Sequence, residues 1–303
     1  MSDVVAEAVA LEAPPSLGES ALLTRCERYG PVAESLVSSS PVDISNEVLV
    51  VADAPYPFHP STGLVTDPAV AGAVANALRT AGATAVSVAL AGGPHADRDR
   101  TQALLGYETV IEHCDLEWVN PEPGTDRHIC HWTGEDGPTW FSVPTDLLDR
   151  TVVVVPSLRP TRTNEVAGAL RTVARAIDPG LPDAATIAAA DVVEPALAIL
   201  DATTAYADGP RTPGVLVAGG PPWVDAVATR LLDGALEDDP VLDSALEPDE
   251  RTVTCSGVDI EALGDGLPVG RYPTRTTPGP LVSACYRLYA TVTGDAVPPQ
   301  FDR

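Results

Sequence analysis

Two histidines follow apolar runs that are expected to be buried strands, and histidine is the side chain whose charge changes nearest neutral pH. His59 lies in the proline-rich loop after Asp53, where the run 48–51 ends, and His95 closes the Gly-Gly-Pro-His segment after the run 85–90. If these strands are neighbours, both imidazoles and the Asp53 carboxylate would meet as catalytic acid–base groups or metal ligands. Otherwise His95 is a solvent-exposed loop residue and Asp53 caps a turn.

Two arginines after a third apolar run indicate an anion-binding function. Arg159 and Arg162 precede Asn164, which is expected to open the next helix. Forked guanidinium donors beside a helix N-terminus suit a small anionic ligand such as a phosphate or carboxylate. The alternative is that these arginines are surface residues that balance an acidic shell.

Two further loops that follow strands could contact the same ligand. Asp201 terminates the run 197–200 and could bind a metal ion, a hydroxyl group or a neighbouring backbone, or only cap a turn. Gly219 and Gly220 precede a proline-led helix and could admit a phosphate or carboxylate. Glycine at these positions could also serve only tight strand–helix packing.

The metal-binding candidates are His113, His128 and Cys130, which belong to the densest group of imidazole and thiol side chains. Imidazole and thiolate suit zinc or iron, but the spacing matches no known finger or ribbon. In an extended strand His128 and Cys130 share a face, whereas His131 points the opposite way. The alternative to a metal site is ordinary packing of a hairpin.

These residues must be positioned by an alternation of strand, loop and helix that repeats five times. Strands are predicted at 48–53, 85–90, 151–155, 197–200 and 215–218, and helices at 15–39, 68–81, 99–105, 164–177, 222–233 and 281–292. Such alternation predicts an α/β fold with a mostly parallel sheet and helices on both faces. A β-hairpin excursion is expected at about 126–143. Ligands of such sheets bind beyond the carboxyl ends of the strands.

We expect an N-terminal helical segment at 1–45, an α/β core at 46–235 and an acidic C-terminal segment at 236–303 that packs on the core. The length of 303 residues suits one large domain with an appendage. The first residues carry Asp3, Glu7 and Glu12 and no basic residue, so a signal peptide is not expected.

The charge composition indicates a halophilic, cytoplasmic protein. All 18 basic residues are arginine, 43 residues are acidic, and the formal net charge is −25. Molar salt would screen the resulting repulsion. The alternative is an acidic mesophilic protein from a GC-rich genome. The same charge argues against binding nucleic acid or an anionic membrane, and five sparse cysteines fit reduced thiols.

The absence of lysine also limits the chemistry. No Schiff base to a lysine can form, so a pyridoxal-phosphate enzyme is not expected. There is no GxxxxGK[ST] loop, which excludes a P-loop nucleotide site, and no GxGxxG segment follows any strand.

The order of several segments resembles the family called domain of unknown function 362, whose members often carry ferredoxin modules. The matching segments cover about two-thirds of the chain and comprise 48–53, Thr66-Asp67-Pro68, 81–83, 149–156 with Leu158-Arg159, 199–202 with Gly209-Pro210, and 216–232. The family's Pro-Lys-Leu-Lys-Thr-His run reads Pro156-Ser157-Leu158-Arg159-Pro160-Thr161 here, and its Lys-Asn pair corresponds to about Arg171-Thr172. The four-cysteine ferredoxin module is absent, so no ferredoxin cluster of its own is expected.

A second similarity is to the nickel-pincer lactate racemases. It rests on the segment from Ala91 to His95 and on Glu112-His113. Those enzymes hold their cofactor through a lysine, so this chain cannot tether it in that way, and no cofactor is assigned.

Two functions follow as hypotheses. The first is a divergent enzyme that acts on a small anionic metabolite, with His59 and His95 as acid–base or metal-binding groups and Arg159 and Arg162 as the anion clamp. The second is a non-catalytic binding or regulatory domain that has lost the family's polar run. The composition leaves the oligomeric state open.

Overall fold

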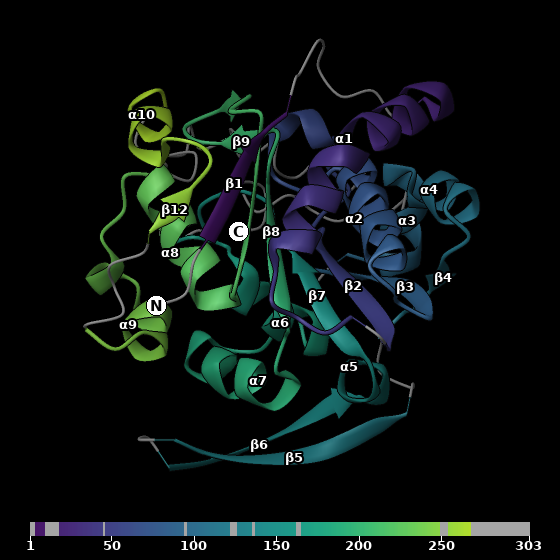
Figure 1. Cartoon of the computed structure of the whole chain (residues 1–303). Helices are drawn as coiled ribbons and strands as arrows, with labels where there is room; N and C mark the ends of the chain where they lie inside the picture. The colour runs from purple at the N-terminus through teal and green to yellow at the C-terminus, as the bar shows by residue number, and fades with distance from the viewer. Residues whose placement is uncertain are drawn as a thin grey trace, which may run out of the picture.

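The computed structural model describes residues 4–9, 18–44, 46–93, 96–121, 126–134, 137–161, 165–248 and 254–267. Its centre is an eight-stranded sheet in the order β12-β1-β11-β8-β7-β2-β3-β4 (Figure 1). These strands are β1 Val4–Ala8, β2 Glu47–Asp53, β3 Ala85–Ala91, β4 Glu117–Trp118, β7 Thr151–Val155, β8 Leu197–Ala202, β11 Val215–Gly219 and β12 Cys255–Ser256. The five from β8 to β4 are parallel, which confirms the predicted fold class.

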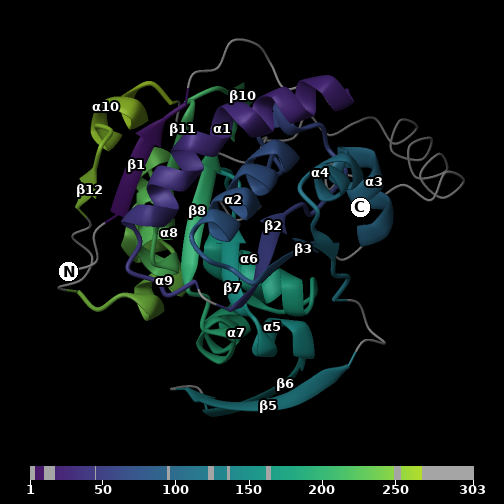
Figure 2. The same cartoon turned by 45° about the vertical axis from the view of Figure 1, so that its right-hand side comes forward.

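Helices cover both faces of the sheet (Figure 2). One face carries α1 Glu19–Ser39, α2 Pro68–Thr80, α3 Arg98–Leu105 and α4 Tyr107–His113. The other carries α6 Ala169–Ile177, α7 Thr186–Val193 and α8 Pro221–Leu231. The shorter helices are α5 Thr145–Asp149, α9 Pro240–Ala245 and α10 Ile260–Asp265, with 3-10 turns at Pro60–Thr62, Asp183–Ala185 and Leu236–Asp238.

The apolar run of β2 shows why these segments form a two-layered core. Val48 and Val50 pack under α1 and α2, whereas Leu49 and Val51 pack with the residues of α6 and α8. All four side chains are fully buried. Because successive strand residues point to opposite faces, a sheet covered on both sides needs such an uninterrupted apolar run.

The helix α2 begins as its sequence predicts. Asp67 is the N-cap, its carboxylate accepts a hydrogen bond from the Ala69 amide, and Pro68 occupies the first turn. The helix ends before Gly82, whose φ of 116° suits glycine. The expected cap, proline and stop signal thus lie where the sequence placed them.

The hairpin excursion is confirmed as β5 Arg127–Gly134 paired with β6 Gly137–Pro144. It lies below the main sheet beside α7 (Figure 1), where Trp132 donates a hydrogen bond to Asp191. A second small hairpin joins β9 Ala205–Tyr206 and β10 Pro210–Arg211.

Three expectations about the elements need correction, and a fourth falls outside the described residues. The first is the direction of β11, which runs antiparallel to β8, so its carboxyl end lies at the opposite edge of the sheet. The second is β1, a strand the sequence did not predict, which joins the sheet between β11 and β12. The third is α6, which begins at Ala169 rather than near 164, because the backbone first forms a bridge between Pro160 and Val166. The helix expected at 281–292 lies outside the described residues.

In the described part of the chain, no helix combines the length and the apolar character that crossing a membrane would require.

Candidate functional site

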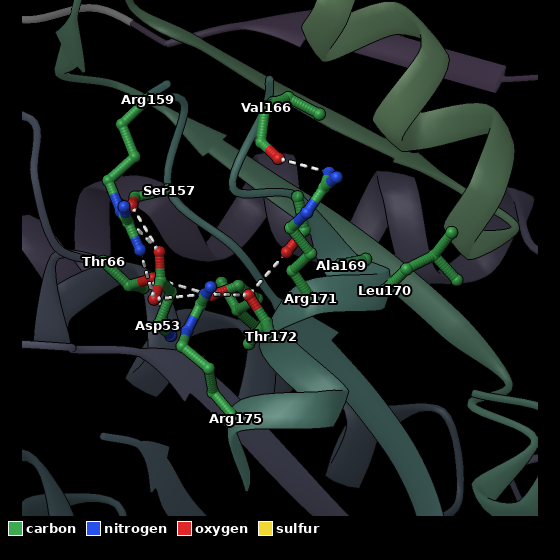
Figure 3. A network of polar contacts seen from close by, with 12 residues as sticks. Asp53, Thr66, Ser157, Arg159, Val166, Ala169, Leu170, Arg171, Thr172 and Arg175 are labelled. Carbon is green, nitrogen blue, oxygen red and sulfur yellow. Dashed lines mark hydrogen bonds and ion pairs between the residues drawn. The ribbon is translucent and has the colours of Figure 1, made fainter. Parts of the chain in front are cut away.

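A buried ion cluster lies at the carboxyl ends of β2, β7 and β8, and Asp53 is its centre (Figure 3). The Arg159 guanidinium donates to Asp53 twice, from Nε at 2.9 Å and from Nη2 at 3.1 Å. Arg175 donates from Nη2 at 2.9 Å, and the Ser157 hydroxyl donates at 2.9 Å. The Asp53 side chain is fully buried, so all its bonds are made inside the protein.

These groups meet because they lie at the ends of neighbouring parallel strands. Asp53 is the last residue of β2, and Ser157 and Arg159 follow β7, which pairs with β2 in parallel. The Thr66 hydroxyl links the ends of these two strands, because it accepts a hydrogen bond from the Asp53 amide and donates one to the Val155 carbonyl. Parallel neighbours bring their carboxyl ends to one edge, so residues far apart in sequence become contacts.

Arg175 reaches the cluster from the helix α6, whose first residues are hydrogen-bonded to Asp225. The Asp225 carboxylate accepts from the amides of Ala169 and Leu170 at 2.5 and 3.0 Å. It fits there because Gly168 has no side chain: a Cβ atom on Gly168 would lie 2.5 Å from the carboxylate carbon. One turn along the helix, the Thr172 hydroxyl accepts from Arg175 at 3.0 Å.

The charge of the cluster is unbalanced, since two guanidinium groups share one carboxylate. Burial alone would raise the pKa of Asp53, but Arg159 and Arg175 outweigh it and hold that pKa below its ordinary value. The pKa of Arg175 is lowered, chiefly by burial, with Asp53 opposing and Arg159 contributing. The Nε of Arg175 is buried and has no hydrogen-bond partner among the described residues.

A neighbouring arginine, Arg171, is neutralised by carboxylates, so the excess positive charge belongs to Arg159 and Arg175. Arg171 forms a two-bond pair with Asp239, both bonds at 2.8 Å, and also donates to the Val166 carbonyl. Asp183 lies 3.3 Å from its Nε. Two carboxylates therefore pair with Arg171, whereas Asp53 is the one carboxylate among the described residues that pairs with Arg159 and Arg175.

A pair of buried carboxyl groups, Asp201 and Asp67, adjoins this cluster. Asp201, at the end of β8, accepts from the Asp67 amide and from the amide and hydroxyl of Thr203. Asp67 is in turn held by two bonds from Arg25. Burial, followed by the charge of Asp67, raises the pKa of Asp201 to about 7, against the opposing effect of its hydrogen bonds. Asp201 is thus an acid that titrates near neutral pH, and its backbone bridges that of Ser157.

The structure brings together some of the residues predicted from the sequence. Asp53, Arg159 and Asp201 lie at one edge, and β3 ends there too, with Ala91 paired to Asp53. His59 is exposed and caps a 3-10 turn, where its Nδ1 accepts from the Ser61 amide at 3.2 Å.

Other predicted residues lie elsewhere or outside the description. His95, Arg162 and Asn164 lie outside the described residues. Gly219 and Gly220 lie at the other edge of the sheet, because β11 is antiparallel to β8. There they line a separate cavity of about 500 Å³ with Trp223 and Leu36.

The metal candidates are not part of the cluster. His113 is the last residue of α4, and His128 and Cys130 lie in the hairpin strand β5. Within the described ranges, no three His, Cys, Asp or Glu side chains form a group that could hold a metal ion.

Two residues of the cluster were missed at the sequence level. Arg175 lies on a helix far along the chain from Asp53, and no local pattern connects them. Ser157 lies in the segment that corresponds to the family's polar run, and this correspondence could have identified it as a site residue. Arg171 and Thr172, at the position of the family's Lys-Asn pair, contact the same region.

Comparison with known proteins gives one family match. A family model described as a domain of unknown function (DUF362) matches residues 48–230, which include every member of the Asp53 cluster. No curated protein matches the chain.

A solved structure from Thermotoga maritima, determined as a structural-genomics target, is similar to 63% of this chain and 52% of that chain, with a TM-score of 0.37 and 14% sequence identity. The matched part of this chain thus spans about half the length of that protein.

Proposed function

Because the chain belongs to the DUF362 family, a family name that specifies no reaction, we propose from the geometry that it is a divergent enzyme acting on a small anionic metabolite at the carboxyl edge of its sheet. The observation that supports this proposal is the ratio of two buried guanidinium groups to one carboxylate. Burying unpaired positive charge is costly, so the protein keeps this excess at the expense of stability. A bound anion would supply the missing negative charge.

Arg175 is the expected anchor for the anion. Its side chain is 17% exposed, twice the 8% of Arg159, so it is the member of the cluster nearest to solvent. Its Nε retains a hydrogen that no described residue accepts. An anion oxygen placed there would gain a charge-assisted hydrogen bond, which contributes about 1.5–3 kcal/mol.

The acid–base group in this proposal is Asp201. A carboxyl whose pKa lies near the working pH can both release and accept a proton. His95 is a second candidate, because its loop follows β3, which ends beside Asp53. Asp53 has a positioning role, since four donors already occupy its two oxygens.

One observation favours a second function, a non-catalytic domain that binds the same anion. Both oxygens of Asp201 accept hydrogen bonds within the protein, and its side chain is 2% exposed. A carboxyl so enclosed must be uncovered before it can exchange a proton with a ligand. The two functions share the arginine site and differ only in turnover.

Calorimetric titration with inorganic phosphate and with a four-carbon dicarboxylate tests the shared site. We expect saturable binding that weakens with ionic strength, and a loss of at least about tenfold in Arg175→Gln, the equivalent of one charge-assisted bond. The matched control is Arg150→Gln, which removes the same charge from the residue just before β7, at the other edge, and should bind as the wild type does.

Two results would overturn the site: no binding of either anion, or equal binding by the wild type and Arg175→Gln. Turnover separates the two functions. Chemical change of a bound metabolite, followed by mass spectrometry and lost in Asp201→Asn, supports the enzyme. Anion binding by the wild type without change of any bound metabolite supports the binding domain.

A further inference from the structure

A pair of cysteines lies on the face of the sheet that α1, α2 and α4 cover, away from the arginine cluster. Cys26 is in the middle of α1, and Cys114 is the residue that caps the end of α4. Both side chains are 3% exposed, and both are free thiols. The anion site uses neither residue.

Both sulfurs lie beside Gly72 of the helix α2. A Cβ atom on Gly72 would lie 3.0 Å from the Cys26 sulfur and 3.6 Å from the Cys114 sulfur. The two sulfurs can therefore be no farther apart than the sum of these distances. Glycine inside a helix costs about 1 kcal/mol relative to alanine, and here it makes room for Val110, whose Cγ1 would lie 2.5 Å from the added Cβ, and for the Cys26 sulfur.

Hydrogen-bond donors converge on one of the two sulfurs. The Asn76 amide donates to the Cys114 sulfur at 3.3 Å. Arg79 donates to the carbonyls of Cys114 and Asp115 at 2.6 and 2.7 Å, which places a positive charge beside the thiol. His113 adds to the same effect from the neighbouring position.

These contacts separate the two thiols chemically. The neighbouring Cys26 thiol is the main cause that lowers the pKa of Cys114 to about 6, and with the Asn76 amide it outweighs burial. The neighbouring Cys114 thiol, with burial, raises the pKa of Cys26 far above its ordinary value. The Asn76 donor and the neighbouring Arg79 thus favour the thiolate of Cys114, the reactive form of cysteine, and Cys26 is the thiol beside it.

We propose that Cys26 and Cys114 are a peroxide-sensitive dithiol that closes into a disulfide between α1 and α4. The low exposure of the sulfurs indicates the class of oxidant. Hydrogen peroxide is little larger than water and can enter where a bulky disulfide cannot.

The reaction proceeds in two steps. The Cys114 thiolate attacks one peroxide oxygen and the O–O bond breaks, which gives a sulfenic acid and a hydroxide that takes a proton to become water. The Cys26 sulfur then attacks the Cys114 sulfur and the S–O bond breaks. The Cys26 proton leaves with that oxygen as a second water. The two thiols lose two electrons, and one peroxide is reduced to two waters.

The test uses a full-length variant in which Cys130, Cys255 and Cys285 are replaced by serine, so that only the pair remains. After hydrogen peroxide treatment, free thiols are labelled under denaturing conditions and the intact mass is measured. We expect a loss of about 2 Da, no label, and full recovery of both thiols with a reductant. Peptide mapping of the wild-type protein should find the same 26–114 cross-link.

Single variants distinguish a redox pair from buried packing. In the Cys26→Ser protein, Cys114 should stop at the sulfenic or sulfinic acid, with a gain of about 16 or 32 Da. In the Cys114→Ser protein, Cys26 should keep its label, because it lacks a thiolate partner. Both thiols remaining labelled, at a peroxide dose that oxidises Cys130 in the wild type, would overturn the proposal. Cross-links that map to other cysteines would do the same.

Discussion

Replacing Asp53 by asparagine is the sharpest test of the ion cluster. The amide keeps the shape of the side chain but removes the charge that Arg159 and Arg175 share. The asparagine amide also has an NH₂ group in place of one carboxylate oxygen, and this group cannot accept hydrogen bonds from Ser157, Arg159 or Arg175. At least one of the four bonds to Asp53 is therefore lost. The variant therefore leaves two buried guanidinium groups without a counter-charge.

The expected cost follows from burial. Removing one partner of a buried pair costs about 3–5 kcal/mol, because the other charge stays desolvated. Arg159 is 8% exposed and stays enclosed, whereas Arg175, at 17%, lies nearer to water. We therefore expect Asp53→Asn to lose about 3–5 kcal/mol, and Asp53→Asn combined with Arg159→Met to lose less than the two single changes together.

Urea unfolding followed by circular dichroism in about 2 M KCl, a concentration chosen for screening, measures these values. The matched control is Asp146→Asn, which removes a carboxylate that is 33% exposed and lies 3.3 Å from Arg150. An exposed pair of this kind contributes less than about 1 kcal/mol. The reasoning is refuted if Asp53→Asn costs no more than this control, or if the double variant shows no coupling.

Further predictions concern pH, backbone and salt. Burial raises the pKa values of Asp201 and Asp225 from 3.8 to about 7, so the folded state holds protons that the unfolded state releases. Stability should fall as the pH rises from about 4 to about 7, and Asp201→Asn should flatten that slope in unfolding midpoints. Gly168→Ala should lose about 2 kcal/mol in urea unfolding, because φ there is 51° and the new Cβ would press on the Asp225 carboxylate. With a net charge of −25, the thermal midpoint should rise steadily from low salt to molar KCl, and a flat response would contradict a halophilic protein.

The sequence predicted those parts of the fold that depend on local order. The run 48–51 is apolar throughout because both faces of β2 are covered, and that pattern alone indicates a parallel strand. Asp67, Pro68 and Gly82 mark the ends of α2 because capping and positive φ act within a few residues. The hairpin was found for the same reason, since its turn and both strands are adjacent in the chain.

Strand direction was not predictable in the same way. The segment 215–219 is as apolar as the other strands, but it pairs antiparallel with β8, which moved Gly219 and Gly220 to the opposite edge. The short strand β1 was missed because its pairing partners, β11 and β12, are distant in sequence. Direction and pairing are fixed by the packing of the whole sheet, so no window of residues contains them.

The sequence by itself determined which groups this protein has for chemistry: strand-end carboxylates, arginines as its only fixed cations, and no lysine. The tertiary structure decided how they combine. It joined Arg175 of α6 to Asp53 of β2, and it placed Cys26 of α1 beside Cys114 at the end of α4, across long stretches of chain. The physical reason is that charge and proton affinity depend on neighbours within a few ångströms, and only folding determines which residues those neighbours are.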